Sequence, residues 1–274
     1  MAPGALDGLR VLSFEARRAD ELATMLARHG ASVARAPALR ETGLPECPEA
    51  HELARRLAAG DVQTVGLLTG VGTRALAAAV SDACPDFPRH LERATIVARG
   101  PKPLAALREL GIGGAHPVPA PHTWREVLGV VDALGAAAGR NVAVQEYGVP
   151  NPALLAALRA RGARVLAVPV YRWAMPEDTG PLHAGAVALV GGEADVAVFT
   201  NGAQVEHLFR VAADETALRA GLGRTVVASI GPVCTEVLEA HGVHPDLEAS
   251  PPKMGPLVAL VAERTRAVLA TKRA

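Results

Sequence analysis

The chain has 274 residues, and its 28 Lys and Arg side chains balance 28 Asp and Glu side chains, so the formal net charge is zero. Half of the residues are apolar, which is typical of a globular protein, and the length predicts two domains. The balanced charge argues against nucleic acid as a partner. Only 3% of the residues are aromatic, too few for a surface on which bases stack.

The three cysteines, Cys47, Cys84 and Cys234, lie far apart in the sequence and form no CxxC pair. We therefore expect free thiols in a reducing compartment rather than a disulfide framework. The first eight residues do not resemble a signal peptide, and no run of about 20 apolar residues follows. The nine histidines lack metal-ligand spacing. The sequence thus predicts a cytoplasmic protein with no membrane contact, no metal and no cofactor.

Short β-branched runs alternate with helical stripes along the whole chain. Strands are predicted at 10–13, 32–36, 64–69, 94–98, 141–145, 164–171, 194–200, 225–230 and within 243–249. Helices are predicted at 20–29, 51–59, 73–80, 103–110, 124–134, 152–161, 182–190, 203–209, 234–241 and 255–270. Continuous apolar strands between helices are typical of parallel sheets covered on both faces. Nine or ten strands exceed one ordinary domain, so we predict an α/β fold with two doubly wound parallel sheets.

The two halves of the chain also resemble each other. Residues 67–76 match 198–207, each reading as strand, Thr, small turn and helix. Residues 96–105 match 229–238, each with a Gly-Pro turn between strand and helix, and 33–37 match 165–169. These pairs indicate an internal duplication.

In doubly wound sheets, ligands bind outside the carboxyl ends of the strands. The predicted strand ends carry hydroxyls and the amides of helix starts, which attract carboxylate or phosphate oxygens. Hydroxyls at such positions often do no more than cap helices. Their repetition in both halves favours a shared ligand instead. The candidate binding residues at these ends are Ser13, Thr69, Gly70, Arg99, Gly100, Tyr147, Thr200, Asn201, Gly202, Ser229, Ile230 and Gly231.

Other chemical motifs are weak. Residues 70–75 fit G-x-G-x-x-A after a strand, but they do not open the first strand–helix–strand unit, and no suitably spaced acid follows. We therefore do not favour dinucleotide binding. No nucleophile elbow, P-loop or zinc-protease motif is present in the sequence. An enzyme of this kind would work by positioning and electrostatics.

The order of the motifs resembles the uroporphyrinogen-III synthase family across essentially the whole chain. No single motif is specific, and the order and spacing carry the resemblance. The similar segments are 68–74, 98–102 with 107–111, 145–148 with 151–162, 168–172, 195–209, and 230–235 with 238–242.

The resemblance implies two flavodoxin-like α/β domains joined by a two-stranded extended linker. Domain 1 would combine residues 1–37 with 174–274, domain 2 would be the inserted segment 42–164, and 33–41 and 165–173 would be the linker strands. It also implies a monomer, with a transient contact to the preceding pathway enzyme as a further expectation.

The implied reaction is a lyase step of porphyrin and haem biosynthesis. It closes hydroxymethylbilane, a linear tetrapyrrole with eight carboxylates, into uroporphyrinogen III, with loss of water and inversion of the terminal pyrrole. Tyr171 matches the linker tyrosine of the family and is the candidate proton donor to the leaving hydroxyl, although it would equally suit simple packing. Thr235 joins the candidate substrate-binding residues, and the basic candidates near the expected cleft are Arg17, Arg18, Arg74, Arg99, Lys102 and Arg172.

The basic candidates have a simpler interpretation as solvated surface side chains. The sequence also departs from the family pattern in places: Ser13 to Arg18 replaces a Thr-Arg pair, Thr200-Asn201 replaces Thr-Ser, and Lys102-Pro103 replaces a turn threonine. Two other functions stay open. One is a non-catalytic, two-lobed protein that binds small anions, and the other is a nucleotide-dependent transferase.

Overall fold

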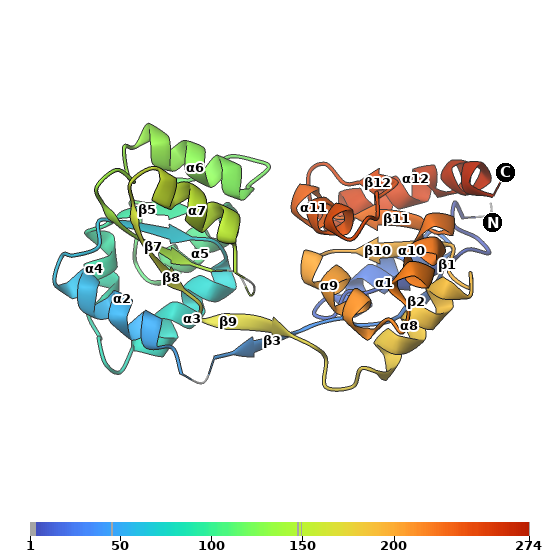
Figure 1. The fold of residues 1–274 in the computed structure, drawn as a ribbon, viewed down its shortest axis with the longest axis horizontal. Helices are drawn as coiled ribbons and strands as arrows, with labels where there is room; N and C mark the ends of the chain where they lie inside the picture. Colours follow the sequence, from blue (N-terminus) through green and yellow to red (C-terminus); the bar gives the residue numbers. More distant parts are fainter. Residues whose placement is uncertain (1–3, 45, 147, 149, 274) are drawn as a thin grey trace. The chain divides into compact units, whose positions relative to one another are not determined.

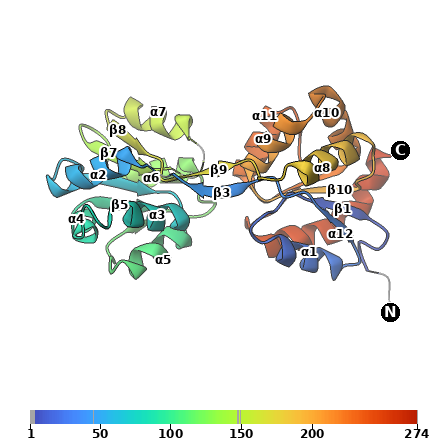
Figure 2. The ribbon, with the colours of Figure 1, turned by 90° about the horizontal axis from the view of Figure 1, so that it is seen from below.

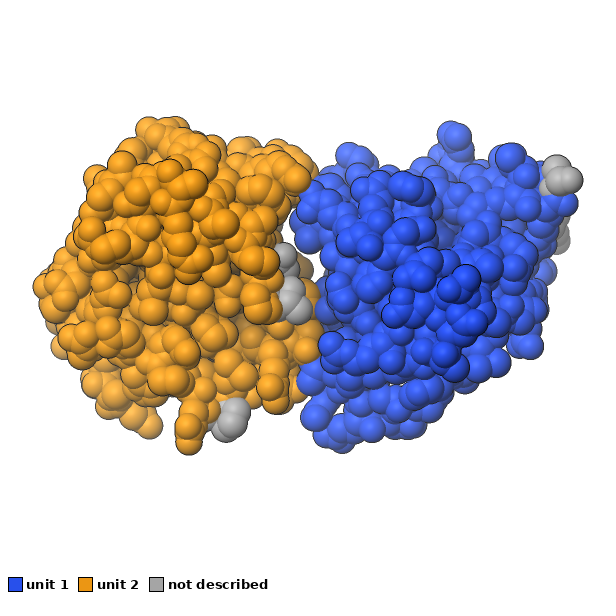
Figure 3. All heavy atoms as spheres, in the orientation of Figure 1, with its two compact units in different colours: residues 1–40, 174–274 blue, residues 41–173 orange. Residues whose placement is uncertain are grey.

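The computed structural model describes residues 4–44, 46–146, 148 and 150–273. The chain divides into two compact units, which Figure 3 colours separately. Unit 1 combines residues 1–40 with 174–274, and unit 2 is the intervening segment 41–173. Each unit contains a five-stranded parallel sheet with helices on both faces (Figures 1 and 2). The predicted α/β fold with two parallel sheets is confirmed.

The sheet of unit 1 has the strand order β12-β11-β10-β1-β2. The strands β10 and β11 read as short apolar runs because both of their faces are buried. Helices α8 to α11 contribute to the hydrophobic cluster on one face, and α1 and α12 cover the other. The bounds are β1 Arg10–Ser13, α1 Ala19–Ala27, β2 Ser32–Arg35, α8 Gly180–Val190, β10 Val196–Phe199, α9 Gly202–Val211, α10 Glu215–Arg224, β11 Val226–Ser229, α11 Pro232–Ala240, β12 Leu247–Glu248 and α12 Met254–Lys272.

The sheet of unit 2 has the strand order β6-β5-β4-β7-β8. Helices α2 to α5 pack against one face, and α6 and α7 pack against the other. The bounds are α2 Pro48–Ala58, β4 Thr64–Leu67, α3 Gly70–Val80, α4 Phe87–Glu92, β5 Thr95–Ala98, α5 Pro101–Glu109, β6 His116–Pro117, α6 Trp124–Ala133, β7 Asn141–Gln145, α7 Pro152–Ala160 and β8 Arg164–Val168.

The matching sequence segments occupy equivalent places in the two sheets. β4 and β10 are the central strands, β5 and β11 are their neighbours, and β8 and β2 lie at the edges. Counted along the chain, unit 1 has the flavodoxin-like order 2-1-3-4-5, whereas unit 2 has 3-2-1-4-5. Unit 2 acquires the order of unit 1 when counting begins at β7. The repeats are therefore related by a circular permutation of the strands.

The segments that cross between the units differ from the expected linkers. Residues 33–41 and 165–173 are the linker strands that the resemblance implies, but β2 pairs with β1 over four residues and β8 pairs with β7 over five. The two-stranded sheet consists instead of β3 (Arg40–Gly43) and β9 (Tyr171–Ala174). The parallel strands β2 and β8 end before Pro37 and Pro169, because proline has no N–H to donate to a strand ladder.

Two helices were not predicted from the sequence. Helix α10 buries only Leu218, Leu222 and Gly221, so its apolar stripe is short, and Asp214 begins it by accepting hydrogen bonds from the amides of Thr216 and Ala217. Helix α4 has six residues, two of them buried, and its pattern is too short to show a helical period.

Candidate functional site

The carboxyl edge of the unit 2 sheet brings Thr69 and Tyr171 together. Thr69 follows β4 and caps α3, its hydroxyl accepting a hydrogen bond from the amide of Gly72 at 3.0 Å. Tyr171 begins β9 and is 5% exposed. The Tyr171 hydroxyl lies 3.1 Å from Oγ1 of Thr69, within hydrogen-bond distance. β4 and β7 flank the point where the strand order of this unit reverses, where doubly wound sheets bind ligands.

The residues around Gly148 explain why Tyr171 reaches this edge. The amide of Trp173 donates to the carbonyl of Gly148 at 3.0 Å, and Gly148 forms a parallel bridge with Arg172. Gly148 has φ +71°, and a Cβ there would lie 2.7 Å from the Trp173 ring. A larger residue at 148 would therefore push β9 away from the end of β7. These contacts fix β9 beside the strand-end surface.

Gln145 and Glu146 are buried at the same edge. Both belong to a predicted strand end, where Tyr147 was the residue chosen as the binding candidate. The Gln145 side chain accepts a hydrogen bond from the amide of Thr69 at 3.3 Å. Glu146 is 6% exposed and accepts from the amide of Asn151 at 3.2 Å. Burial raises the pKa of the Glu146 carboxyl, and this single hydrogen bond only partly offsets the effect. Their position at the end of a predicted strand is the sequence feature that indicates a place in the site.

Gly70 and Gly100 act here through close packing. A Cβ on Gly70 would lie 2.6 Å from the carbonyl oxygen of Lys102, so only glycine lets the start of α3 approach the start of α5 this closely. Gly100 precedes α5 with φ +84°, and the ring of His122 lies over it. Two helix N-termini therefore lie side by side at this edge.

The basic candidates of unit 2 differ in their surroundings. The Arg74 guanidinium forms two hydrogen bonds of 2.7 Å to the Glu109 carboxylate, which hold the pKa of Glu109 below its usual range. Nε of Arg99 donates to the carbonyl of Leu68 at 3.0 Å, at the end of β4. Lys102 and Arg172 are exposed. Arg74 thus stabilises the packing of α3 on α5, while Arg99 lies at the strand-end surface.

The carboxyl edge of the unit 1 sheet brings Thr200, Asn201 and Glu15 together. The Thr200 hydroxyl donates to the Glu15 carboxylate, and its amide donates to the Gln204 side chain at 2.8 Å. Asn201 caps α9 by accepting from the amide of Ala203 at 2.9 Å. A Cβ on Gly202, the first residue of α9, would lie 2.7 Å from Val237 in α11. The arrangement repeats that of Thr69 and Gly70 in unit 2.

Most of the remaining unit 1 candidates form hydrogen bonds within the protein. Ser229 is fully buried, donates to the carbonyl of Gly231 at 3.0 Å and accepts from the Thr235 hydroxyl at 3.0 Å. The amide of Ile230 donates to the carbonyl of Phe199 at 2.9 Å. These contacts shape the turn before α11 rather than presenting free donors.

The three remaining candidates from the sequence are Ser13, Arg17 and Tyr147. Ser13, at the end of β1, is 1% exposed, and its hydroxyl has no hydrogen-bond partner among the described residues. Arg17 lies on the surface. Tyr147 falls outside the described residues.

The described part of the chain contains no group of three or more His, Cys, Asp or Glu side chains arranged to hold a metal. Within that same part, no helix has the length and apolar character needed to cross a bilayer.

Comparison with known proteins decides the family. The model of the uroporphyrinogen-III synthase HemD family matches residues 20–259. The chain belongs to the uroporphyrinogen-III synthase family. The resemblance seen in the sequence is therefore confirmed.

Three similar proteins match this uroporphyrinogen-III synthase family member over different shares of its length. A solved uroporphyrinogen III synthase of Thermus thermophilus is 30% identical, with a TM-score of 0.76, and the match covers 96% of this chain and 100% of that one. A Methanothermobacter thermautotrophicus protein named "Putative uroporphyrinogen-III synthase" is 32% identical over 58% of this chain and 63% of its own length. The Bacillus subtilis protein YjjA is 27% identical over 96% of this chain and 98% of its own.

Proposed function

We propose that this chain is a uroporphyrinogen-III synthase that cyclises hydroxymethylbilane to uroporphyrinogen III. The observation that carries the proposal is the Tyr171 hydroxyl 3.1 Å from Thr69 Oγ1 at the carboxyl edge of the unit 2 sheet. It places a phenol beside the N-termini of α3 and α5. Family membership and the Thermus thermophilus structure support the same assignment.

Proton transfer to the leaving hydroxyl is the step that we assign to Tyr171. The pyrrole nitrogen assists departure of hydroxide from the adjacent methylene, so one proton donor suffices to release water. A phenol with an ordinary pKa near 10 is protonated at neutral pH. The Thr69 hydroxyl already accepts a hydrogen bond from the Gly72 amide, so its own proton can point to the tyrosine oxygen. In that orientation Thr69 stabilises the phenolate that remains after transfer.

Substrate binding is assigned mainly to backbone amides and short polar side chains. Helices α3 and α5 in unit 2 and α9 and α11 in unit 1 all begin at the carboxyl edges of their sheets. Helix N-termini favour carboxylate groups, and hydroxymethylbilane carries eight. Arg99 and Lys102 supply positive charge at the unit 2 edge. Binding then needs no large excess of basic residues, in keeping with the zero formal charge of the chain.

The deciding experiment supplies the purified protein with enzymically made hydroxymethylbilane and identifies the uroporphyrinogen isomer formed. The proposal expects the type III isomer, because the enzyme must direct closure through the inverted pyrrole. Formation of the type I isomer alone, at the rate seen without protein, would overturn it. Saturable binding of the substrate together with that negative result would favour the anion-binding alternative.

A further inference from the structure

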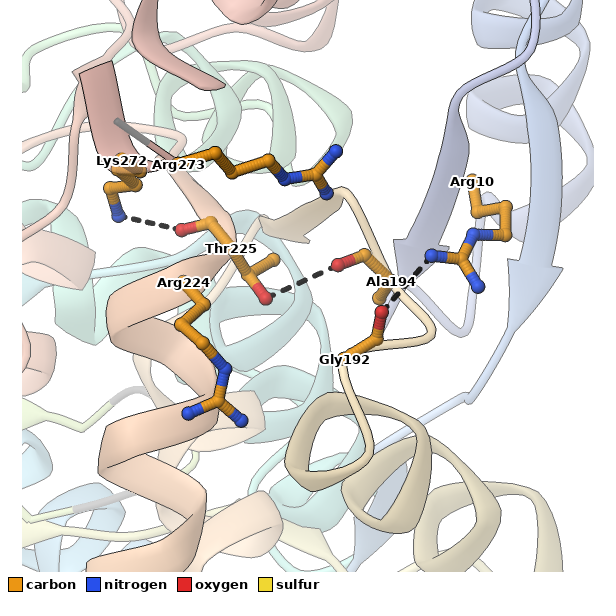
Figure 4. A pocket seen from close by; sticks show the side chains of 7 residues that line it. All are labelled: Arg10, Gly192, Ala194, Arg224, Thr225, Lys272 and Arg273. Carbon is orange, nitrogen blue, oxygen red and sulfur yellow. Dashed lines mark hydrogen bonds between the residues drawn. The ribbon is translucent and has the colours of Figure 1, made fainter. Parts of the chain in front are cut away.

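Unit 1 contains a pocket with basic side chains in its lining, at the opposite edge of its sheet from the carboxyl ends of the strands. The pocket has a volume of about 520 Å³ and is lined by Arg10, Gly192, Ala194, Arg224, Thr225, Lys272 and Arg273. β1 begins at Arg10, β10 begins two residues after Ala194, and β11 begins directly after Thr225, so the lining belongs to the amino edge. Figure 4 shows the four cationic side chains around Thr225 and Ala194.

The charges in this pocket do not balance. Asp195, 4% exposed, accepts hydrogen bonds from the Arg10 amide at 2.7 Å and from the Arg273 guanidinium at 2.5 Å. Lys272 lies 2.6 Å from the Asp246 carboxylate. Four cationic side chains therefore face two carboxylates, which leaves an excess of two positive charges in a chain of zero formal charge. Glu193, exposed between two lining residues, does not itself line the pocket.

The protein uses only part of the donor capacity of these side chains. Arg224 donates from one nitrogen to the carbonyl of Val190 at 3.0 Å, and Arg10 donates to the carbonyl of Gly192 at 3.0 Å. A guanidinium has five N–H donors in a fork that matches phosphate or carboxylate oxygens. Among the described residues, Nη1 of Arg10, Arg224 and Arg273 makes no hydrogen bond, so each fork retains donors for a ligand.

The internal duplication shows that the fold does not require this cluster. Gln63 of unit 2 stands where Asp195 stands in unit 1, and its side chain accepts from the Asn141 amide at 2.9 Å, as Asp195 accepts from the Arg10 amide. Asn141 thus takes the place of Arg10. In unit 2 an amide pair takes these two places, and Nε of Arg164 donates to Oδ1 of Asn141 at 2.7 Å. Unit 1 differs in having a buried carboxylate at this position and four cationic side chains in the pocket lining.

We propose that this amino-edge pocket binds a small polyanion that carries phosphate groups. The excess of two positive charges matches a phosphate dianion, and the volume lies in the range of small-molecule sites. None of the seven lining residues is aromatic, so a nucleobase would find no ring on which to stack. The chemistry favours a sugar phosphate or an oligophosphate over a nucleotide. The site is separate from the strand-end surfaces and does not depend on the proposed function.

Calorimetric titration of the full chain with inorganic pyrophosphate and tripolyphosphate tests the proposal. Wild-type protein should bind with one-site stoichiometry, more weakly as salt increases. Arg224→Gln should weaken binding about tenfold or more, because it removes a charged donor, and Arg273→Gln should act in the same direction. Both residues are exposed, and melting curves check that the variants fold.

Arg264→Gln is the matched control, because Arg264 is an exposed residue of α12 that does not line the pocket and carries the same charge. Its affinity should stay within about twofold of wild type. Equal losses in Arg264→Gln and Arg224→Gln would mean diffuse attraction and would overturn the proposal. Hydrogen exchange with pyrophosphate present should slow at 190–194 and 271–273. Slowing only at 69–72 or 200–203, or no binding at millimolar pyrophosphate, would also overturn it.

Discussion

The hydroxyl of Tyr171 lies 3.1 Å from Oγ1 of Thr69, although the two residues are 102 positions apart in the chain. Tyr171 lies near the end of the segment 41–173 that forms unit 2, and Thr69 caps α3, the second helix of that unit. This pair joins the candidate proton donor to the helix N-terminus that the sequence repeats in both halves.

Replacing Tyr171 with Phe should lower turnover about 100-fold, since general acid catalysis contributes about that much or more. The phenyl ring keeps the packing against Trp173, whose ring centroid lies 6.4 Å away, so the melting temperature should change little. Initial rates of uroporphyrinogen III formation measure the effect. An unchanged rate would remove Tyr171 from the mechanism.

Replacing Thr69 with Val should lower the free energy of unfolding by about 1 kcal/mol, because α3 loses its side-chain cap. Turnover should also fall, since the tyrosine loses its hydrogen-bond partner. Thr69→Ser keeps the hydroxyl and should restore both properties. In the double variant with Tyr171→Phe, the two losses of turnover should not add. Fully additive effects would argue against functional coupling between these hydroxyls.

Replacing Gly70 with Ala should destabilise unit 2 by about 1–3 kcal/mol, because the new methyl group would overlap the backbone of α5 at Lys102. Gly129→Ala is the matched control. Gly129 lies exposed within α6 with open space around its Cα, so alanine there should stabilise by about 0.5–1 kcal/mol. Urea unfolding curves measure both changes. Similar stability of the two variants would contradict the close approach of α3 and α5.

Replacing Glu146 with Gln should raise the melting temperature at neutral pH. The pKa of this carboxyl is raised by burial, so the folded state holds its proton to higher pH than the unfolded state does. Stability therefore falls as the pH rises through that window, and a neutral amide avoids the loss. The gain should shrink as the pH approaches the ordinary range of Glu, about 4.3.

Glu126→Gln is the control, for which we expect the opposite change in melting temperature. Burial acts to raise the pKa of Glu126, but hydrogen bonds from Thr123 outweigh it, and the pKa is lowered. That substitution should therefore lower the melting temperature at neutral pH. If both variants shifted the melting temperature in the same direction, the pKa shifts assigned to Glu126 and Glu146 would be wrong.

Replacing Asp195 with Asn should lower the free energy of unfolding by about 1–3 kcal/mol at neutral pH, since a buried charged acceptor is lost. Burial acts to raise the pKa of Asp195, but hydrogen bonds from Arg10 and Arg273 outweigh it and hold the pKa below its usual range. The stabilisation is complete above the ordinary Asp pKa, about 3.9, and is lost as pH falls through the folded-state value.

The difference between wild type and Asp195→Asn should therefore disappear in acid. Melting temperatures across the acid range measure it, with the exposed Glu193→Gln variant as a control of equal charge change. A difference that persists unchanged at the lowest pH would show that the amide itself, rather than the lost charge, destabilises unit 1.

The sequence by itself determined most of the local elements, the internal duplication and the family. Short buried strands and helices with regular apolar spacing are local patterns, and the repeats at 67–76 and 198–207 could be seen by alignment within the chain. The repeat places Gly70 opposite Asn201, and only the structure shows that Gly70 and Gly202 are equivalent points of close helix contact. The order of motifs over the whole chain was enough to indicate the family.

Only the tertiary structure decided which candidate residues contact one another and which already form hydrogen bonds within the protein. Periodicity carries no information about a pairing such as Arg74 with Glu109, or about the internal bonds of Ser229, because these depend on distances between elements. It likewise could not reveal the basic pocket at the amino edge of unit 1, whose residues come from four separate places in the chain. Packing of the sheet brings them together, and the burial of Asp195 among them became visible only then.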